Sequence, residues 1–299
     1  MSDAKIYKIL NLVLTLVGRL PMAVSTFCSD ILGLLWFKID KRHRTVTLDN
    51  IQKALGDEMT PHQVMRMGKK VFKNIASIFF EVAWSYQLDR KTLLSHFTVT
   101  GIEHVENAQA KGNGVMVLAG HLGNFELNIH AIEDTPMKGY GIYRKMDFPP
   151  LEQLMLDVRQ RFGYTMVAIH GASKKLDTIL GEGGVVGTLL DQSVDWYAGV
   201  FVDFFGRPAC TNKGLASLTL RTKAAVVPMC CSRKNRKIFI EFLPEIPLED
   251  TGDRIKDIEN NTQNYTSAIE SMVRRHPDQY FWVHNRWKTP SFSVYPRQS

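Results

Sequence analysis

The sequence predicts an α/β protein: a mixed, mostly parallel sheet flanked by helices and preceded by a helical N-terminal part. Three observations lead to this fold class. Short apolar runs alternate with helical patterns after residue 97, polar residues follow several of those runs, and residues before 97 carry only helical patterns. A chain of 299 residues, 44% hydrophobic and 22% charged, can bury one large core or two. We expect an N-terminal segment over 1–45 and an α/β domain over 46–299 with a helical lead-in to about 97.

The first segment is the most apolar part of the chain. Residues 6–37 are rich in Leu, Val, Ile and Phe, but Arg19, Pro21 and Asp30 interrupt them. Neither half reaches the roughly 18 uninterrupted apolar residues of a clear transmembrane helix. The pattern favours a tilted anchor or a pair of helices that dips into a membrane.

Basic residues lie on both sides of this segment. Lys5 and Lys8 precede it, and a larger group follows it: Lys38, Lys41, Arg42 and Arg44. The positive-inside rule then leaves the rest of the chain on the cytoplasmic side, where these residues can contact anionic headgroups. Two alternatives stay open, a cleaved signal peptide and a helix pair buried in a soluble core.

A long helix is expected to begin at residue 60. Thr60 suits the cap, Pro61 the first helical position, and Gln63 the third, where its side chain can return to the cap. Apolar residues then recur at helical spacing over 64–86, which is typical of a helix that packs in a core.

The remaining elements follow from alternating short runs. We predict strands near 114–119, 139–143, 165–169, 185–190, 200–205, 224–231 and 237–243. We predict helices near 124–133, 150–162, 173–181, 211–222 and 254–275.

The stretch Gly120-His121-Leu122-Gly123-Asn124-Phe125-Glu126 is the strongest candidate site. It follows the strand pattern 114–119, and the carboxyl ends of strands are where open α/β sheets hold their ligands. On one helix, His121 and Glu126 would point about 140° apart. If His121 lies in the turn and Gly123 or Asn124 caps a helix, Glu126 falls in its first turn and can hold the imidazole. Such a pair suits a histidine that removes a proton from a hydroxyl; a capped helix after an ordinary histidine is the alternative.

Other polar residues also follow predicted strands and helices. Arg144 closes one strand, Arg159 and Arg161 close the next helix, and Asp191 and Gln192 close the strand 185–190. Arginines there can bind phosphate oxygens bidentately, although each can also be an ordinary surface ion pair.

Composition limits the partners. A formal net charge of +7 favours anionic partners: nucleic acid, an anionic membrane, an acidic protein or a phosphorylated substrate. Four cysteines without CxxC spacing indicate structural thiols in a reducing compartment. We predict no metal site, because His130 lies nine residues beyond His121 and no HExxH motif is present.

Several blocks together resemble the lauroyl and myristoyl transferases of late lipid A biosynthesis, within the lysophospholipid acyltransferase superfamily. The blocks are Gly18 to Pro21, GHLGNFE at 120–126, 141–163, LLDQ at 189–192, 199–229, and YFWVHNRWKTP at 280–290. The resemblance covers nearly the whole chain, and six blocks in order are far more specific than a lone His-x-x-x-x-Glu.

The resemblance implies a glycerol-phosphate acyltransferase-like fold in which 46–299 is the acyltransferase domain. It implies transfer of a fatty acyl chain from acyl carrier protein to a hydroxyl of a lipid A precursor, at the cytoplasmic face of a bacterial inner membrane. The acyl thioester is a co-substrate, and no cofactor or metal is implied. His121 would be the general base and Glu126 its partner. Substrate would be bound by Asn124, Arg144, Arg159, Arg161, Asp191 and Gln192.

The implied partners are acyl carrier protein, a phosphorylated glycolipid acceptor and inner-membrane lipid, with no nucleic acid. Two departures are visible. The commoner histidine–aspartate pair is histidine–glutamate here, and GVFVDFFGRPA stands near the place of the FPEG-type phosphate block. Three other functions fit the same residues: acylation of another glycolipid or lipid, hydrolysis of a thioester, or lipid binding without catalysis. The absence of a GxSxG motif argues against a serine hydrolase.

Overall fold

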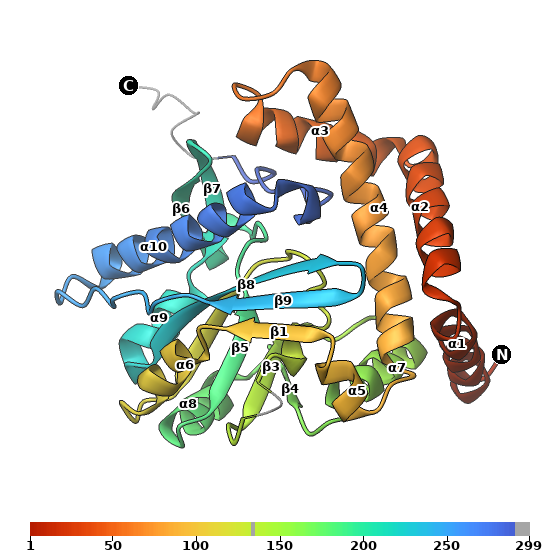
Figure 1. Ribbon diagram of the computed structural model, residues 1–299. Coiled ribbons are helices and arrows are strands. Elements are labelled where there is room, and N and C mark those ends of the chain that lie inside the picture. The colour runs from red at the N-terminus through yellow and green to blue at the C-terminus, as the bar shows by residue number, and fades with distance from the viewer. Residues whose placement is uncertain (133–134, 291–299) are drawn as a thin grey trace.

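The computed structural model describes residues 1–132 and 135–290. Its centre is a seven-stranded mixed sheet in the order β1-β9-β8-β2-β5-β3-β4 (Figure 1). The strands are β1 (Phe97–Thr100), β2 (Val115–Ala119), β3 (Gly139–Tyr143), β4 (Thr165–Ala168), β5 (Val185–Leu189), β8 (Ala225–Lys234) and β9 (Lys237–Phe242). Only the β8–β9 pair is antiparallel. Strands β6 (Gly199–Phe204) and β7 (Arg207–Asn212) form a separate hairpin.

Helices surround this sheet (Figure 1). Before β1 lie α1 (Asp3–Gly18), α2 (Met22–Ile39), α3 (Lys41–Leu55), α4 (Pro61–Ser85) and α5 (Arg90–Leu94). Within the α/β part lie α6 (Ile102–Gln109), α7 (Pro149–Gln160), α8 (Ser173–Gly181), α9 (Gly214–Thr222) and α10 (Arg254–Arg275). Short 3₁₀ helices are η1 (Asn128–His130), η2 (Trp196–Ala198) and η3 (Pro277–Gln279). The α/β class with a mostly parallel mixed sheet is therefore confirmed.

Strand β2 separates two apolar cores. Met116 and Leu118 enter one core, while Val117 and Ala119 enter the other. This alternation follows from the period of two along a strand, and burial on both faces explains why β2 is apolar throughout. Because β5 and β8 run parallel to β2 on either side, residues that follow β2 and β5 meet at one edge of the sheet.

Helix α4 connects the N-terminal helices to the sheet. It begins as expected, since Thr60 and Gln63 form a reciprocal capping box and Pro61 occupies the first turn. It contacts both α1 and α2 (Figure 1). Residue 45, the expected boundary between two regions, falls within α3.

Helix α2 is the one described helix that is both long and apolar enough to cross a membrane. Only 22% of its 18 residues are buried, so most of its surface is not covered by protein. Exposed apolar residues include Leu12, Val13 and Leu16 on α1, and Phe27, Leu32 and Leu35 on α2. This exposure argues against a helix pair buried in a soluble core.

The structure corrects several expected elements. In place of a helix over 124–133 there is only η1, and residue 133 lies outside the described part. Strands β1 and β7 were not expected: β1 is a short edge strand with three exposed residues, and β7 contains Pro208 and polar residues. Helices α3, α5 and α6 were also missed. The expected helix over 211–222 begins at Gly214, because the chain is still in β7 at Asn212.

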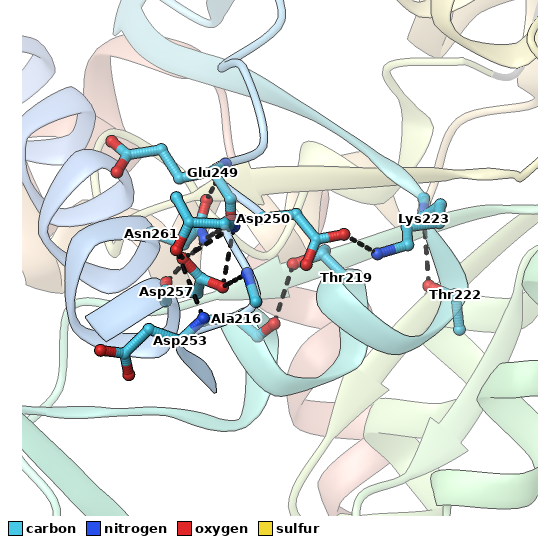
Figure 2. Close-up of polar contacts among 12 residues, drawn as sticks. Ala216, Thr219, Thr222, Lys223, Glu249, Asp250, Asp253, Asp257 and Asn261 are labelled. Carbon is cyan, nitrogen blue, oxygen red and sulfur yellow. Dashed lines mark hydrogen bonds and ion pairs between the residues drawn. The ribbon is translucent and has the colours of Figure 1, made fainter. Parts of the chain in front are cut away.

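The start of α10 is fixed by a buried carboxylate (Figure 2). The Asp257 side chain accepts hydrogen bonds from the backbone N–H groups of Thr251 and Gly252 and from the Thr251 hydroxyl. Asn261, one turn later, exchanges hydrogen bonds with the Glu249 backbone. These bonds satisfy loop groups that α10 would otherwise bury unpaired, so the apolar face of α10 is held against the sheet.

Candidate active site

The turn that carries His121 is held by the C-terminal segment rather than by a helix. The Gly123 N–H donates to the Gln279 carbonyl (3.1 Å), and the Phe281 N–H donates to the His121 carbonyl (3.0 Å). Gly123 has φ +63°, and a Cβ there would lie 2.7 Å from the Cys231 carbonyl oxygen. Because these backbone groups are already bonded across the fold, the turn cannot continue into the helix expected from the sequence.

His121 is held by Asp191. Nδ1 lies 2.8 Å from Asp191 Oδ1, and the backbone N–H of His121 donates to Oδ2 at 3.1 Å. A carboxylate can only accept, so the proton of the neutral imidazole lies on Nδ1 and Nε2 carries the lone pair. Gln192 Nε2 lies 3.3 Å from that Nε2. The ring also packs edge-on against Phe125, with centroids 4.8 Å apart.

The His121 imidazole and the Asp191 carboxylate stabilise each other's charge. Burial by itself lowers the pKa of His121, but the Asp191 carboxylate, its hydrogen bond and the more distant charge of Glu126 outweigh burial, so the pKa is raised. Burial would raise the pKa of Asp191, but the charge of His121 and the hydrogen bonds lower it to about 2. The pair therefore favours an ionised Asp191 and an imidazole that is more basic than that of a free histidine.

Glu126 does not make the contact with His121 that was expected. Its two oxygens accept from Nε and Nη2 of Arg159, each at 2.9 Å, and both side chains are more than four-fifths buried. The physical reason is that residues 124–127 do not form the first turn of a helix. Glu126 therefore points toward α7, where the Arg159 guanidinium is a bidentate partner for its carboxylate. Glu126 still raises the pKa of His121 through its charge.

His121, Glu126 and Arg159 border a cavity of about 370 Å³ on the side of the sheet that faces α7. Arg144 and Gln192 are also part of its wall, whereas most of the lining is apolar, including Val117, Ile142, Met166 and Phe242. Gly141 and Gly187 lie opposite each other on β3 and β5, border the cavity and leave room for the Tyr164 and Met166 side chains that also line it. Glycine inside a strand is a signal for such space, and it could have located the cavity from the sequence.

Two expected site residues lie elsewhere. Asn124 is completely buried behind the turn and donates to Glu81 Oε2 at 2.8 Å. Arg161 packs over the rings of Phe162 and Tyr86, with its guanidinium 4.3 and 5.7 Å from their centroids. Neither borders the cavity. The placement therefore gives no support to substrate contacts by these two residues.

A buried ion pair supports the turn from α4. Glu81 pairs with Arg233 of β8, and the two side chains are 13% and 10% exposed. Arg233 also donates to the Asn74 carbonyl at 2.7 Å, and Glu81 accepts from Asn124. The pair thus links α4, the sheet and the His121 turn. No sequence signal predicted it, because the partners are 152 positions apart.

Among residues 1–132 and 135–290, no group of three or more His, Cys, Asp and Glu side chains is placed to hold a metal ion. The prediction that none is needed stays a prediction.

Fold and site together describe an α/β enzyme: a carboxylate-held imidazole at the carboxyl ends of parallel strands, beside an apolar cavity that suits a lipid chain. The family described as bacterial lipid A biosynthesis acyltransferase matches residues 3–289. The chain belongs to this family, as the sequence blocks indicated, and it is an O-acyltransferase of lipid A biosynthesis.

Similar proteins carry corresponding names. A lipid A biosynthesis acyltransferase of Haemophilus influenzae is 26% identical over 272 residues, which cover 90% of this chain and 83% of that protein. The lipid A biosynthesis lauroyltransferase of Escherichia coli is 25% identical over 278 residues, 93% of this chain and 89% of that protein. A phosphatidylinositol mannoside acyltransferase of Mycobacterium tuberculosis is 23% identical over 205 residues, 67% of this chain and 61% of that protein.

Proposed function

We propose that the chain transfers a fatty acyl group from an acyl carrier protein thioester to a hydroxyl of a lipid A precursor, with His121 as general base. The observation that carries the mechanism is the contact of Nδ1 with Asp191, which leaves the Nε2 lone pair for a substrate proton. The apolar cavity beside it is proposed to hold the acyl chain.

The proposed reaction has two steps. The acceptor hydroxyl replaces Gln192 at Nε2 and gives up its proton as its oxygen attacks the thioester carbonyl carbon. The tetrahedral intermediate then collapses: the carbon–sulfur bond breaks, and the leaving thiolate takes the proton from the His121 imidazolium. Products are the ester and the free thiol of the carrier. Asp191 holds the ring and stabilises the imidazolium, and Glu126 adds negative charge from a greater distance.

Arg144 and Arg159 are proposed to bind phosphates of the acceptor or of the donor's pantetheine arm. Arg144 is exposed and borders the cavity, which suits a phosphate at the entrance. Arg159 already pairs with Glu126, so it would hold that carboxylate in position as well as contact a phosphate.

The test is mass spectrometry of a lipid A precursor incubated with the protein and a mixed pool of acyl carrier thioesters. We expect a gain of one acyl chain, none with His121→Ala, and weaker use of the donor at high salt, because a basic protein attracts an acidic carrier electrostatically. Free fatty acid without a gain in mass would establish a thioester hydrolase instead. Equal use of coenzyme A thioesters would contradict the assigned donor, and acylation of a mannoside alone would contradict the acceptor.

We also propose that α1 and α2 hold the protein at the cytoplasmic face of a bacterial inner membrane. The support is their exposed apolar surface, together with Phe79 of α4, which is 45% exposed. Basic residues in the last turn of α2 and the first turn of α3, including Lys38 and Lys41, suit an anionic lipid surface.

For this proposal we expect Leu12→Glu combined with Phe27→Glu to lower binding to phosphatidylglycerol-containing vesicles roughly tenfold or more, since carboxylates are costly in hydrocarbon. The two side chains are 56% and 65% exposed, so folding should be retained. Ile255→Glu on α10, where the native side chain is 73% exposed, is the matched control and should bind like the wild type. Equal binding by all three proteins in a flotation assay would reject the role of α1 and α2.

A further inference from the structure

The cavity wall contains one polar side chain that the proposed mechanism does not use. Asn128 begins η1, is 9% exposed and borders the cavity. Neither its amide oxygen nor its amide nitrogen has a hydrogen-bond partner. Among the described residues it is the one amide side chain whose two polar atoms are both buried and unpaired.

Other buried amides of this fold use at least one of their two polar groups. Asn261 accepts from the Glu249 N–H and donates to carbonyl oxygens, and Asn124 donates to Glu81. Buried polar groups in native proteins are nearly always hydrogen-bonded, because desolvation without a partner is costly. A leucine, which has the same branched shape and the same number of side-chain heavy atoms, would suit the apolar wall without this cost. Asn128 is therefore best explained by a group that enters the cavity.

The chemistry of that group follows from the two unpaired atoms. An amide offers a donor and an acceptor side by side, and a hydroxyl can accept from the first and donate to the second. A thioester carbonyl can only accept, so it would leave the amide oxygen unpaired. A methylene of a plain fatty chain satisfies neither atom.

We propose that Asn128 binds a hydroxyl carried by the donor's acyl chain, so that the enzyme prefers a hydroxyacyl thioester to the plain chain of equal length. This inference rests on the proposed function, because it takes the cavity as the acyl site. It deepens that function by assigning the substrate class and the residue that selects it.

The test is a competition at fixed acceptor between a plain acyl carrier thioester and its 2-hydroxy and 3-hydroxy counterparts of equal length. We expect the wild type to transfer one hydroxylated chain roughly tenfold faster, since a buried amide left unpaired is costly. Asn128→Leu should lose the preference while it still transfers the plain chain. Ile129→Leu, also in the cavity wall, should keep the preference because it leaves the amide in place.

Thermal unfolding separates this role from a structural one. Asn128→Leu should unfold at the same or a higher temperature than the wild type, because it removes a buried polar group that the free protein leaves unpaired. A lower unfolding temperature with an unchanged preference would make Asn128 structural and overturn the proposal.

The wild-type competition decides the question without any variant. Equal transfer of plain and hydroxylated chains overturns the role of Asn128 and leaves the proposed function standing. Transfer of neither chain refutes the proposed function, and the inference with it. A preference that persists in Asn128→Leu assigns the selection to another residue and also overturns the proposal.

Discussion

Replacing Asp191 by asparagine is expected to lower the rate of acyl transfer by about 10⁴-fold, the effect seen when the aspartate of a serine protease triad is replaced in this way. A side-chain amide at this position can donate as well as accept, so it permits the wrong imidazole tautomer, in which the proton lies on Nε2. The substitution also removes the negative charge that stabilises the imidazolium. Steady-state kinetics with a saturating donor would measure the loss.

The pH profile gives a second, independent readout of the same change. The base works when His121 is neutral, so activity should fall with decreasing pH as His121 becomes protonated. In the wild type this fall is expected above the ordinary histidine range, because the pKa of His121 is raised. Asp191→Asn removes the main cause of that rise, so the residual activity should persist to lower pH.

The control is Asp195→Asn, four residues away and exposed, where little effect is expected. Glu126→Gln distinguishes the two carboxylates. It should shift the pH profile less than Asp191→Asn does, because Glu126 acts on His121 through its charge and not through a hydrogen bond. Unchanged kinetics in Asp191→Asn, with a full loss in Glu126→Gln, would contradict the assignment of Asp191.

Replacing Arg233 by methionine is expected to cost about 3–5 kcal/mol of unfolding free energy. The change leaves the Glu81 carboxylate buried without its cation and removes a donor from the Asn74 carbonyl. For a chain of this size the thermal midpoint should fall on the order of 10 °C. Activity should fall as well in the folded fraction, since Asn124 in the His121 turn depends on Glu81.

Arg221→Met is the matched control for this prediction. Arg221 pairs with Asp177 at 2.7 Å, but the two side chains are 44% and 38% exposed, so the expected cost is within about 1 kcal/mol. The double change Glu81→Leu with Arg233→Met should be less destabilised than Arg233→Met alone, because no buried charge is left unpaired. Equal stability of Arg233→Met and Arg221→Met in differential scanning calorimetry would refute the role of the buried pair.

Local patterns predicted most of the sheet and the long helices. The apolar run of β2 and the capping box at Thr60 are properties of a few adjacent residues, so the sequence alone identifies them. The turn after β2 is different. His121 and Gly123 each form a backbone hydrogen bond with a residue more than 150 positions later, and these two bonds replace the helix that the local pattern favours.

In the site, too, some features follow from adjacent residues and others from residues far apart in the sequence. His121 and Asp191 were each predicted at a strand end, and the adjacency of β2 and β5 brings them together. The choice of Asp191 over Glu126 as the partner of the imidazole depends on Arg159, which lies on another helix and takes up both Glu126 oxygens. Asn128 carries no local signal, since an asparagine inside an apolar stretch looks the same whether or not it has a partner.

Helix α1, the first element of the chain, is docked on α7, where the Tyr7 hydroxyl donates to Asp157 at 2.6 Å. The two residues are 150 positions apart, so during synthesis the first helix leaves the ribosome long before its partner exists. Until α7 is synthesised, α1 lacks this docking surface, and the exposed apolar side chains of α1 have no protein cover. Apolar surface exposed in this way makes a nascent chain prone to aggregation. An early encounter with a bilayer would end that risk, and α7 would then be added to a helix already held in lipid.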